Sequence, residues 1–534
     1  MAIKMLFTSY EFIGFLSILV VLYYIIPKKI QWVLLLLGSY FFYFMANPRY
    51  LFFIVTTTVL TYITAMIIEQ NFIRQKAYLK EHKAVLKRDE RKLYKNAQGK
   101  TRRRWLVTCL IVSLGILAVT KYTNFFIANI NGVMEGFGGT RQLSFLNIIV
   151  PLGISFYTFQ SIAYLIDVYR ETVHAEKNFF RYALFVSFFP QLIQGPISRF
   201  GDLSQTLGKE HDFSWKAIGD GLFRILWGYF KKLVIADRLL VAVSLMLGSS
   251  EIYRGAYALL TMIFYTLELY ADFTGGIDIT IGIAEMLGIK VKENFMRPYF
   301  SKSLKEYWRR WHISMCTWFK DYIFYPVSVS KVMQRISKIA RKYLGDKTGK
   351  RLPVYLSSFI VWLATGIWHG ASWNFVVWGL LNWIVLMISE EMEPLYLKFH
   401  NSFTIGNRWI YKVFQIGRTF LLICVLNLFD CYEAVATTLD VLASIFTTWN
   451  WNVLVDGSLL ALGLTLADYY IIFIGILLMI TVSLVQRGGS VRVKIASLHY
   501  YFRVAIYFGL FLMIILWGSY GVGYDSSQFI YNQF

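Results

Sequence analysis

The sequence has few charged residues, few cysteines and few histidines, and each shortage excludes a class of protein. Charged residues make up 16% of its 534 residues, whereas soluble domains carry about 25%. The four cysteines include no CxxC pair, which argues against a disulfide framework or a zinc knuckle. The seven histidines are spread along the chain without metal-ligand spacing. No GxSxG elbow of a serine hydrolase is present.

The sequence is instead rich in apolar residues: 57% of its residues are hydrophobic, and the aromatic residues among them make up 18% of the chain. Apolar runs near the length of a membrane span recur from one end of the chain to the other. We therefore predict an all-α polytopic membrane protein with roughly 11–13 transmembrane helices plus re-entrant or interfacial helices. Residues 1–520 should form a single membrane bundle, and residues 521–534 a separate tail.

Positive charge is concentrated between the apolar segments. The net charge is +22, and Glu69–Arg104 alone carries thirteen Lys or Arg. Lys331–Arg351 carries eight against one Asp. The positive-inside rule identifies both as cytoplasmic loops, and it places the N-terminus and the tail on the outer side. This pattern argues against nucleic-acid binding, which needs a basic soluble face.

Two apolar stretches are interrupted by polar residues. Phe185–Phe200 contains two prolines and the polar residue Gln194, which predicts either a re-entrant, broken helix lining a cavity or an ordinary interfacial loop. Glu268–Asp278 holds three acids, among them Asp272, near a Gly-Gly break. Its spacing fits no calcium loop, so we expect helix caps and salt bridges to Arg297, Arg309 or Arg310. Ile279–Leu287 is too short to span a bilayer.

Two histidines, each preceded by a tryptophan, lie at the edges of apolar segments. A helix over Trp308–Tyr325 would place His312 on an aromatic stripe. His369 interrupts an apolar run between Gly366 and Gly370, which allow a bend and a close backbone approach. Histidine exchanges protons near neutral pH, and polar groups are costly at bilayer depth. Residue physics alone leaves a catalytic and a structural interpretation open for both.

The residues around these histidines resemble a known family. The matching segments are Tyr307–Ser314 with Trp318, Asp321 and Pro326, then Gly366–Phe375, Tyr270–Gly275, Pro151–Phe156 and Gln191–Pro196. Together they resemble the membrane-bound O-acyltransferases, in particular the bacterial branch that O-acetylates alginate or D-alanylates teichoic acid. The resemblance covers nearly the whole chain, and the two histidine motifs are its most specific part.

The resemblance implies a cytoplasmic acyl donor and an acceptor that meet in a tunnel through the protein. The donor would be acetyl-CoA or an acyl-carrier-protein thioester, used as a substrate, with no bound cofactor or metal. His369 matches the invariant histidine of the family and is expected to be the general base. His312 would orient a substrate or stabilise the oxyanion. We expect further side chains to line the tunnel: Trp308, Arg309, Trp368, Asp272 and Gln194.

The C-terminal tail carries a second resemblance. Phe529-x-Tyr531-x-x-Phe534 is similar to an acyl-transfer motif of this branch, in which the tyrosine receives the acyl group. A polar aromatic tail can also be an interfacial anchor. If the resemblance holds, Tyr531 is acylated near His369 and passes the group to an extracytoplasmic partner transferase.

The function expected from the sequence is O-acylation, with acetyl as the preferred group, of a cell-surface or extracellular polysaccharide. The enzyme would lie in the bacterial inner membrane. The alternatives are D-alanyl transfer to teichoic acid, a non-enzymatic polysaccharide transporter, and a non-catalytic scaffold. A transporter would show paired inverted repeats, and the sequence contains no convincing repeat. The tail motif on the same chain favours acetylation over D-alanylation.

Overall fold

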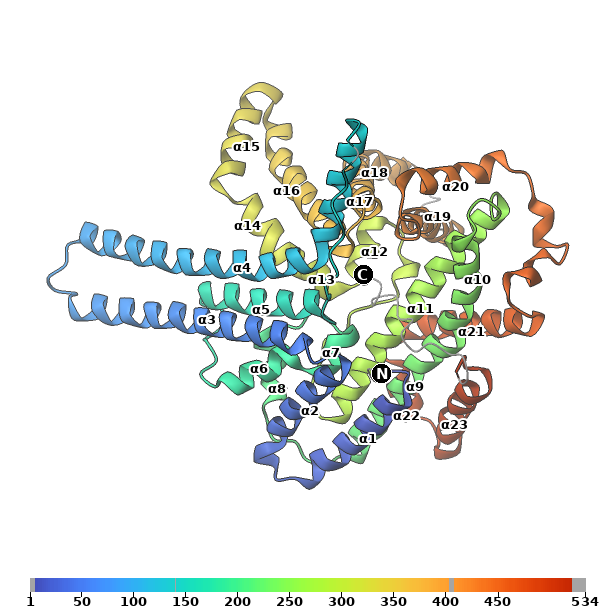
Figure 1. Cartoon of the computed structure of the whole chain (residues 1–534), viewed down its shortest axis with the longest axis horizontal. Helices are drawn as coiled ribbons and strands as arrows, with labels where there is room; N and C mark the ends of the chain where they lie inside the picture. The colour runs from blue at the N-terminus through green and yellow to red at the C-terminus, as the bar shows by residue number, and fades with distance from the viewer. Residues whose placement is uncertain (1–4, 140, 403–407, 521–534) are drawn as a thin grey trace. The chain divides into compact units, whose positions relative to one another are not determined.

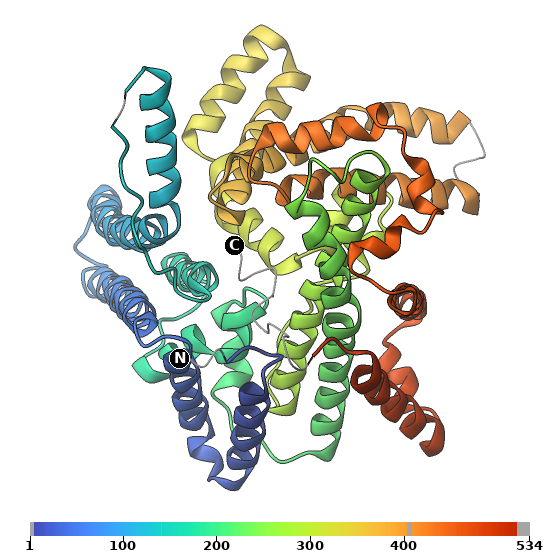
Figure 2. The same cartoon turned by 45° about the vertical axis from the view of Figure 1, so that its right-hand side comes forward.

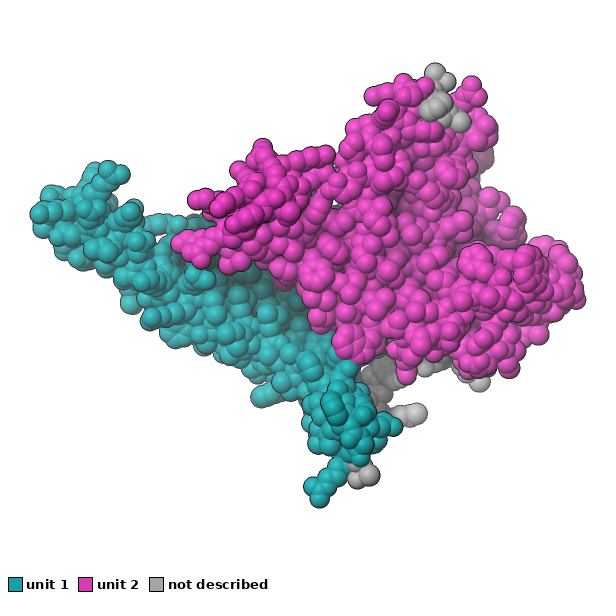
Figure 3. All heavy atoms as spheres, turned by 90° about the horizontal axis from the view of Figure 1, so that it is seen from above, with its two compact units in different colours: residues 1–218, 284–291 teal, residues 219–283, 292–534 magenta. Residues whose placement is uncertain are grey.

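A computed structural model describes residues 5–139, 141–402 and 408–520 of the chain (Figure 1). Within these ranges every regular element is a helix, which confirms the all-α prediction. Eight of the described helices are long and apolar enough to cross a membrane. This number is smaller than the 11–13 expected, because several apolar segments form shorter helices such as α1 (Tyr10–Ile25). The chain divides into two compact units, coloured separately in Figure 3.

Unit 1 comprises residues 1–218 and 284–291. Besides α1, its helices are α2 (Gln31–Ala46), α3 (Tyr50–Glu81), α4 (Arg88–Gly136), α5 (Ile154–Tyr169), α6 (Phe179–Ser187), α7 (Phe189–Gln194) and α8 (Phe200–Leu207). Tyr23 and Tyr24 of α1 donate hydrogen bonds to the backbone carbonyls of Leu287 and Met286. These bonds attach the distant segment 284–291 to the start of the chain.

The basic segment Glu69–Arg104 is mostly helical and forms no extended loop. Helices α3 and α4 run side by side as an antiparallel pair, joined only by residues 82–87 (Figures 1 and 2). With 32 residues, α3 is about 48 Å long, which exceeds the roughly 30 Å hydrocarbon thickness of a bilayer. Arg102 lies 3.8 Å from the ring centre of Phe72 and donates to Asn71 and Gln75. Such contacts keep the polar parts of the two helices paired.

The interrupted stretch Phe185–Phe200 is a broken helix, as one of the two predictions stated. Helix α6 ends at Ser187, α7 ends at Gln194, and residues 195–199 are not helical. Almost every side chain from Tyr182 to Ile197 is buried. Irregular backbone at membrane depth needs such protein surroundings, because lipid cannot satisfy its polar groups.

Unit 2 comprises residues 219–283 and 292–534. Its first helices are α9 (Trp215–Tyr229), the π-helical segment η2 (Phe230–Ala236), α10 (Asp237–Gly248) and α11 (Ala256–Met286). Around the histidine motifs follow α12 (Leu304–Arg310), α13 (Ile313–Phe319), the π-helical segment η4 (Lys320–Phe324), α14 (Tyr325–Ser328), α15 (Lys331–Leu344), α16 (Asp346–His369) and α17 (Trp373–Glu391). The last are α18 (Glu393–Ser402), α19 (Trp409–Asn427), α20 (Val435–Thr447), α21 (Leu466–Val485), α22 (Val491–Ala496) and α23 (Tyr500–Trp517).

Helix α11 corrects two sequence predictions. It continues through Gly275 and Gly276, and it also includes the apolar part of Ile279–Leu287 that was read as a separate short segment. The glycines serve close packing instead of a break. A Cβ on Gly275 would lie 2.9 Å from the carbonyl oxygen of Gly228, and one on Gly282 would lie 2.7 Å from that of Gly221. Small residues on facing helices allow such backbone approach in membrane bundles.

Candidate functional site

His312 lies at a break between two helices, so the predicted continuous helix over Trp308–Tyr325 is wrong. Helix α12 ends at Arg310, and α13 starts at Ile313. His312 itself has φ 44° and ψ 52°, which is the left-handed region that residues other than glycine seldom occupy. The side chain is fully buried. A strained backbone at a buried histidine is typical of functional sites.

Asn294 holds this break in place. The backbone N–H of Ile313 donates to the carbonyl oxygen of Asn294 at 3.0 Å, and that of Ser314 donates to its Oδ1 at 2.9 Å. The Nδ2 of Asn294 lies 3.2 Å from Nδ1 of His312. Because a backbone N–H can only donate, the atom facing Ser314 is the amide oxygen, and the NH₂ group faces the histidine. Nδ1 therefore accepts a hydrogen bond.

This contact determines which nitrogen of His312 carries the proton. Burial and, to a smaller extent, the nearby His369 lower the pKa of His312 from 6.5 to about 3. The ring is thus neutral at physiological pH. With Nδ1 accepting from Asn294, the proton of the neutral ring lies on Nε2. His312 is therefore a hydrogen bond donor at Nε2.

His369 is the last residue of α16, one residue before the helix-ending Gly370. Its ring centre lies 4.5 Å from that of Trp378 on α17 and 6.3 Å from that of Phe375. A Cβ on Gly366 would lie 2.4 Å from the carbonyl oxygen of Phe375, so the glycine allows α16 and α17 to approach closely. The expectation that the flanking glycines allow a close backbone approach is confirmed at Gly366.

The structure brings the two histidines together, although they are 57 positions apart in the sequence. Trp368 contacts both, with its ring centre 6.1 Å from that of His312 and 5.0 Å from that of His369. Phe319 of α13 packs against the same tryptophan. We call six residues the histidine cluster: His312, His369, Trp368, Phe319, Asn294 and Trp378.

Trp308 reaches the edge of this cluster. Its Nε1 donates to the side-chain oxygen of Asn382 at 3.0 Å, and its ring centre lies 5.7 Å from that of Trp378. Its neighbour Arg309 is exposed. Trp308 and Arg309 were both expected to line the tunnel, but they differ in their surroundings. Trp308 packs against a ring that contacts His369, whereas Arg309 is exposed.

Three predicted site residues remain, namely Asp272, Gln194 and Tyr531. Asp272 is fully buried and pairs with Lys232 at 2.6 Å, so its partner is a lysine of η2 and not one of the expected arginines. Gln194 is fully buried at the end of α7 in unit 1. Tyr531 belongs to residues 521–534, outside the described residues.

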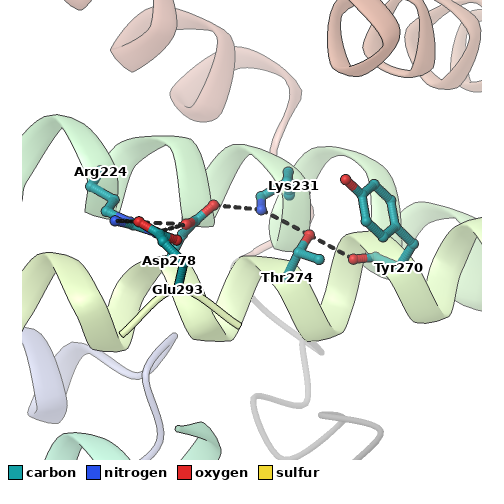
Figure 4. A network of polar contacts seen from close by, with 6 residues as sticks. All are labelled: Arg224, Lys231, Tyr270, Thr274, Asp278 and Glu293. Carbon is teal, nitrogen blue, oxygen red and sulfur yellow. Dashed lines mark hydrogen bonds and ion pairs between the residues drawn. The ribbon is translucent and has the colours of Figure 1, made fainter. Parts of the chain in front are cut away.

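A network of charges joins α9, η2 and α11 to Glu293 in the loop after α11 (Figure 4); Arg224, Lys231 and Asp278 are largely buried, and Glu293 is about half exposed. Arg224 makes a bidentate contact with Glu293, at 2.7 and 2.6 Å, and also pairs with Asp278 at 2.9 Å. Lys231 pairs with Asp278 at 2.6 Å and donates to Thr274 at 2.8 Å. We call Arg224, Lys231, Asp278 and Glu293 the ion-pair network.

Sequence reasoning missed both Asn294 and the ion-pair network. Lys231 and Lys232 are charges inside an apolar stretch, and buried charges are found paired. Lys232 pairs with the nearby Asp237, but the other partners, Asp278 of Lys231 and Asp272 of Lys232, lie more than 35 residues further along the chain. Nothing in the local sequence marks Asn294. Across the described ranges, no group of three or more His, Cys, Asp or Glu is placed to hold a metal ion.

Comparison with known proteins identifies a conserved domain in this chain. The model of the MBOAT, or membrane-bound O-acyltransferase, family matches residues 171–338. This range includes His312, Asn294 and the ion-pair network, and it ends before His369.

Curated relatives extend the similarity. A probable alginate O-acetylase of Azotobacter vinelandii is 36% identical over 291 residues, covering 54% of each chain. A peptidoglycan O-acetyltransferase of Helicobacter pylori is 33% identical over 335 residues, which is 58% of this chain and 59% of that protein. A teichoic acid D-alanyltransferase of Bacillus subtilis is 26% identical over 284 residues, which is 52% of this chain and 68% of that protein.

The matched regions span a little over half the length of the two O-acetylating relatives. They agree with the resemblance seen in the histidine motifs, and the helical architecture is that of a multi-pass membrane protein. Residues 171–338 of this chain therefore match the membrane-bound O-acyltransferase family.

Proposed function

We propose that this protein transfers an acyl group, preferably acetyl, from a cytoplasmic thioester to a cell-surface polysaccharide. The observation that carries the proposal is the contact of both His312 and His369 with the same tryptophan, Trp368. Relatives with 33–36% identity are named for O-acetylation, and one with 26% identity for D-alanylation. This difference favours acetyl over D-alanyl as the group transferred.

In the proposed mechanism the two histidines have different tasks. His369 accepts the proton of the acceptor hydroxyl while the hydroxyl oxygen attacks the thioester carbonyl. The Nε2–H of His312 donates to the carbonyl oxygen as negative charge develops there. The C–S bond then breaks, and the proton on His369 passes to the leaving thiolate, which departs as a thiol. The surrounding tryptophan and phenylalanine rings limit water, which would otherwise hydrolyse the thioester.

The first acceptor in this proposal is the phenol of Tyr531. An ester on Tyr531 would be passed to an extracytoplasmic partner transferase, and the donor would never cross the membrane. The proposed location is the bacterial inner membrane, with both termini outside. Acetyl-CoA and an acyl-carrier-protein thioester are the two donors to compare.

The test uses the full-length protein in proteoliposomes with isotope-labelled acetyl-CoA or acetylated carrier protein. Mass spectrometry of the C-terminal peptide should find the label on Tyr531, and Tyr531→Phe should lose it while the protein still folds. His369→Ala should reduce label transfer by at least about 100-fold, the contribution typical of a general base. The matched control is His174→Ala, because the His174 side chain is 93% exposed.

The competing interpretations make different predictions in the same assay. A transporter or a scaffold would retain its function in cells that carry His369→Ala. A D-alanyl transferase would label from a D-alanylated carrier protein and not from either acetyl donor. Polymer acetylation that persists in cells with Tyr531→Phe would reject the tyrosine relay but not the acyltransferase itself.

A further inference from the structure

Unit 2 contains a cavity of about 730 Å³ beside the ion-pair network. This volume is within the range of small-molecule sites. Its lining comes from α9, η2 and α11, from Glu293 and residues 295–297, and from the segment that contains α21, α22 and α23. The proposed acyl-transfer mechanism uses none of these residues.

One side of the cavity is apolar and is formed by two membrane helices. The side chains on this side are Leu478, Met479, Val482, Ile506, Leu510 and Met513. Helices α21 and α23 are candidate membrane spans, with only 22% and 11% of their apolar windows buried. Most of their apolar surface is therefore not covered by the rest of the described chain, as expected for helices that face lipid acyl chains.

The ion-pair network forms part of the opposite side, and its charges balance. Arg224 and Lys231 contribute two positive charges, and Asp278 and Glu293 contribute two negative charges (Figure 4). The network itself therefore attracts neither anions nor cations strongly. Any net charge in the cavity comes from the other residues that line it.

Arginines supply that net charge. Arg297 and Arg492 both line the cavity. Burial lowers the pKa of Arg297, and the cations Arg310 and Arg487 lower it further, which shows that positive charges are crowded here. Glu306 is the one acid among the groups affecting Arg297, and it already pairs with Arg310. An anion at Arg297 would relieve this repulsion.

Aromatic rings separate the cavity from the histidine cluster. Phe295 lines the cavity, and its ring centre lies 4.9 Å from those of Phe273 and Trp311. On the other side of this layer, the ring centre of Phe273 lies 4.9 Å from that of His312. A molecule in the cavity is thus one layer of rings away from the reacting groups, which argues against the reacting thioester as its occupant.

We propose that this cavity binds one anionic glycerophospholipid, with its phosphate at Arg297 and Arg492 and an acyl chain against α21 and α23. Basic pockets between membrane helices bind the headgroups of anionic lipids. Arg297 is three residues from Asn294, which holds His312, and the Met296 N–H bonds to the carbonyl oxygen of Arg310. The bound lipid would thereby stabilise the loop that positions His312.

The binding test places the full-length protein in nanodiscs of phosphatidylcholine with or without phosphatidylglycerol. Native mass spectrometry should find one phosphatidylglycerol retained in preference to phosphatidylcholine. Each of Arg297→Gln and Arg492→Gln should weaken retention about five-fold, the effect expected for one cation near an anionic lipid. Arg335→Gln on α15 is the matched control, because Arg335 is exposed and does not line the cavity.

A second variant tests the cavity by volume instead of charge. Gly509 lines the cavity, and nothing lies within 4 Å of a Cβ built on it. Gly509→Phe should therefore fill the acyl-chain side and displace the lipid without removing a charge. Equal retention of both lipids by the wild-type protein would overturn the proposal. Release of phosphatidylglycerol by coenzyme A would also overturn it, because the cavity would then be a donor site.

An activity measurement tests whether the bound lipid helps to position His312. This test rests on the proposed acyl transfer. Phosphatidylglycerol should raise the labelling rate of the wild-type protein and leave that of Arg297→Gln unchanged. Selective lipid retention without any effect on labelling would reject the proposed role of the lipid in positioning His312, but it would support the proposed binding site. If His369→Ala also labels normally, the acyltransferase proposal fails, whereas the result for lipid retention is unaffected.

Discussion

The histidine cluster and the ion-pair network lie in the same unit, but they solve the problem of burying polar groups in opposite ways. The network keeps four charges and pairs each with an opposite charge at 2.6–2.9 Å. The cluster keeps His312 neutral and surrounds it with aromatic rings and one amide. A neutral imidazole can donate or accept a proton during a reaction, whereas a paired charge is held in place. The difference suggests that the network stabilises the fold and the cluster carries the chemistry.

Removing one charge from the network tests this assignment most strongly. Asp278→Asn leaves Arg224 and Lys231 with only Glu293 as an acidic partner, so we expect a loss of about 3–5 kcal/mol of unfolding free energy. Unfolding in mixed micelles measures it. Asp346→Asn, which breaks an exposed pair with Lys350, should produce no measurable change. A stable Asp278→Asn protein would show that the network is not a stabilising element.

A substitution in the histidine cluster should lower the rate of acyl transfer without changing the stability of the fold. His312→Asn retains a residue that tolerates the left-handed conformation, but its amide is too short to replace Nε2. We expect the rate of acyl transfer to fall about 100-fold, as for loss of one oxyanion donor. Single-turnover labelling of the purified variant measures this rate. A normal rate in His312→Asn would assign His312 a structural role.

Helix packing beneath His369 should have an intermediate effect. A Cβ on Gly379 would lie 2.5 Å from the carbonyl oxygen of Trp362 and 3.2 Å from the Cα of Gly366. Backbone atoms cannot move aside as a flexible side chain can, so Gly379→Ala should destabilise the protein by about 1–3 kcal/mol. Thermal unfolding in detergent measures the change. The control is Gly417→Ala on α19, where a Cβ meets nothing within 4 Å.

The pH dependence of stability tests the neutral state of His312. The pKa of His312 is about 3 in the folded protein, below its ordinary value of 6.5. Between these values the unfolded chain binds a proton that the folded chain does not, so stability decreases as the pH falls. The slope should be about 1.4 kcal/mol per pH unit. Unfolding curves at pH 6.5 and 4.5 should show a smaller decrease for His312→Asn than for wild type, and an equal decrease would contradict a buried neutral His312.

Much of the fold could be predicted from the sequence, because bilayer thickness and hydrophobicity impose simple rules. The helical class followed from the apolar runs, and the broken helix around Gln194 was one of the two structures that their interruptions predicted. The sequence predictions were wrong where tertiary contacts decide whether a helix continues or ends. The glycines of α11 were read as a break, and they allow packing against α9. The stretch after Trp308 was read as a continuous helix, and Asn294 interrupts it at His312.

The sequence by itself determined that the chain is a helical membrane protein and that His312 and His369 stand out as candidate reactive groups. These properties depend on composition and on local motifs. Only the tertiary structure decided that both histidines pack on Trp368, that Asn294 places the proton of His312 on Nε2, and that Asp272 pairs with Lys232. The reason is that each of these contacts joins groups distant in the sequence or depends on burial, and no local pattern encodes either.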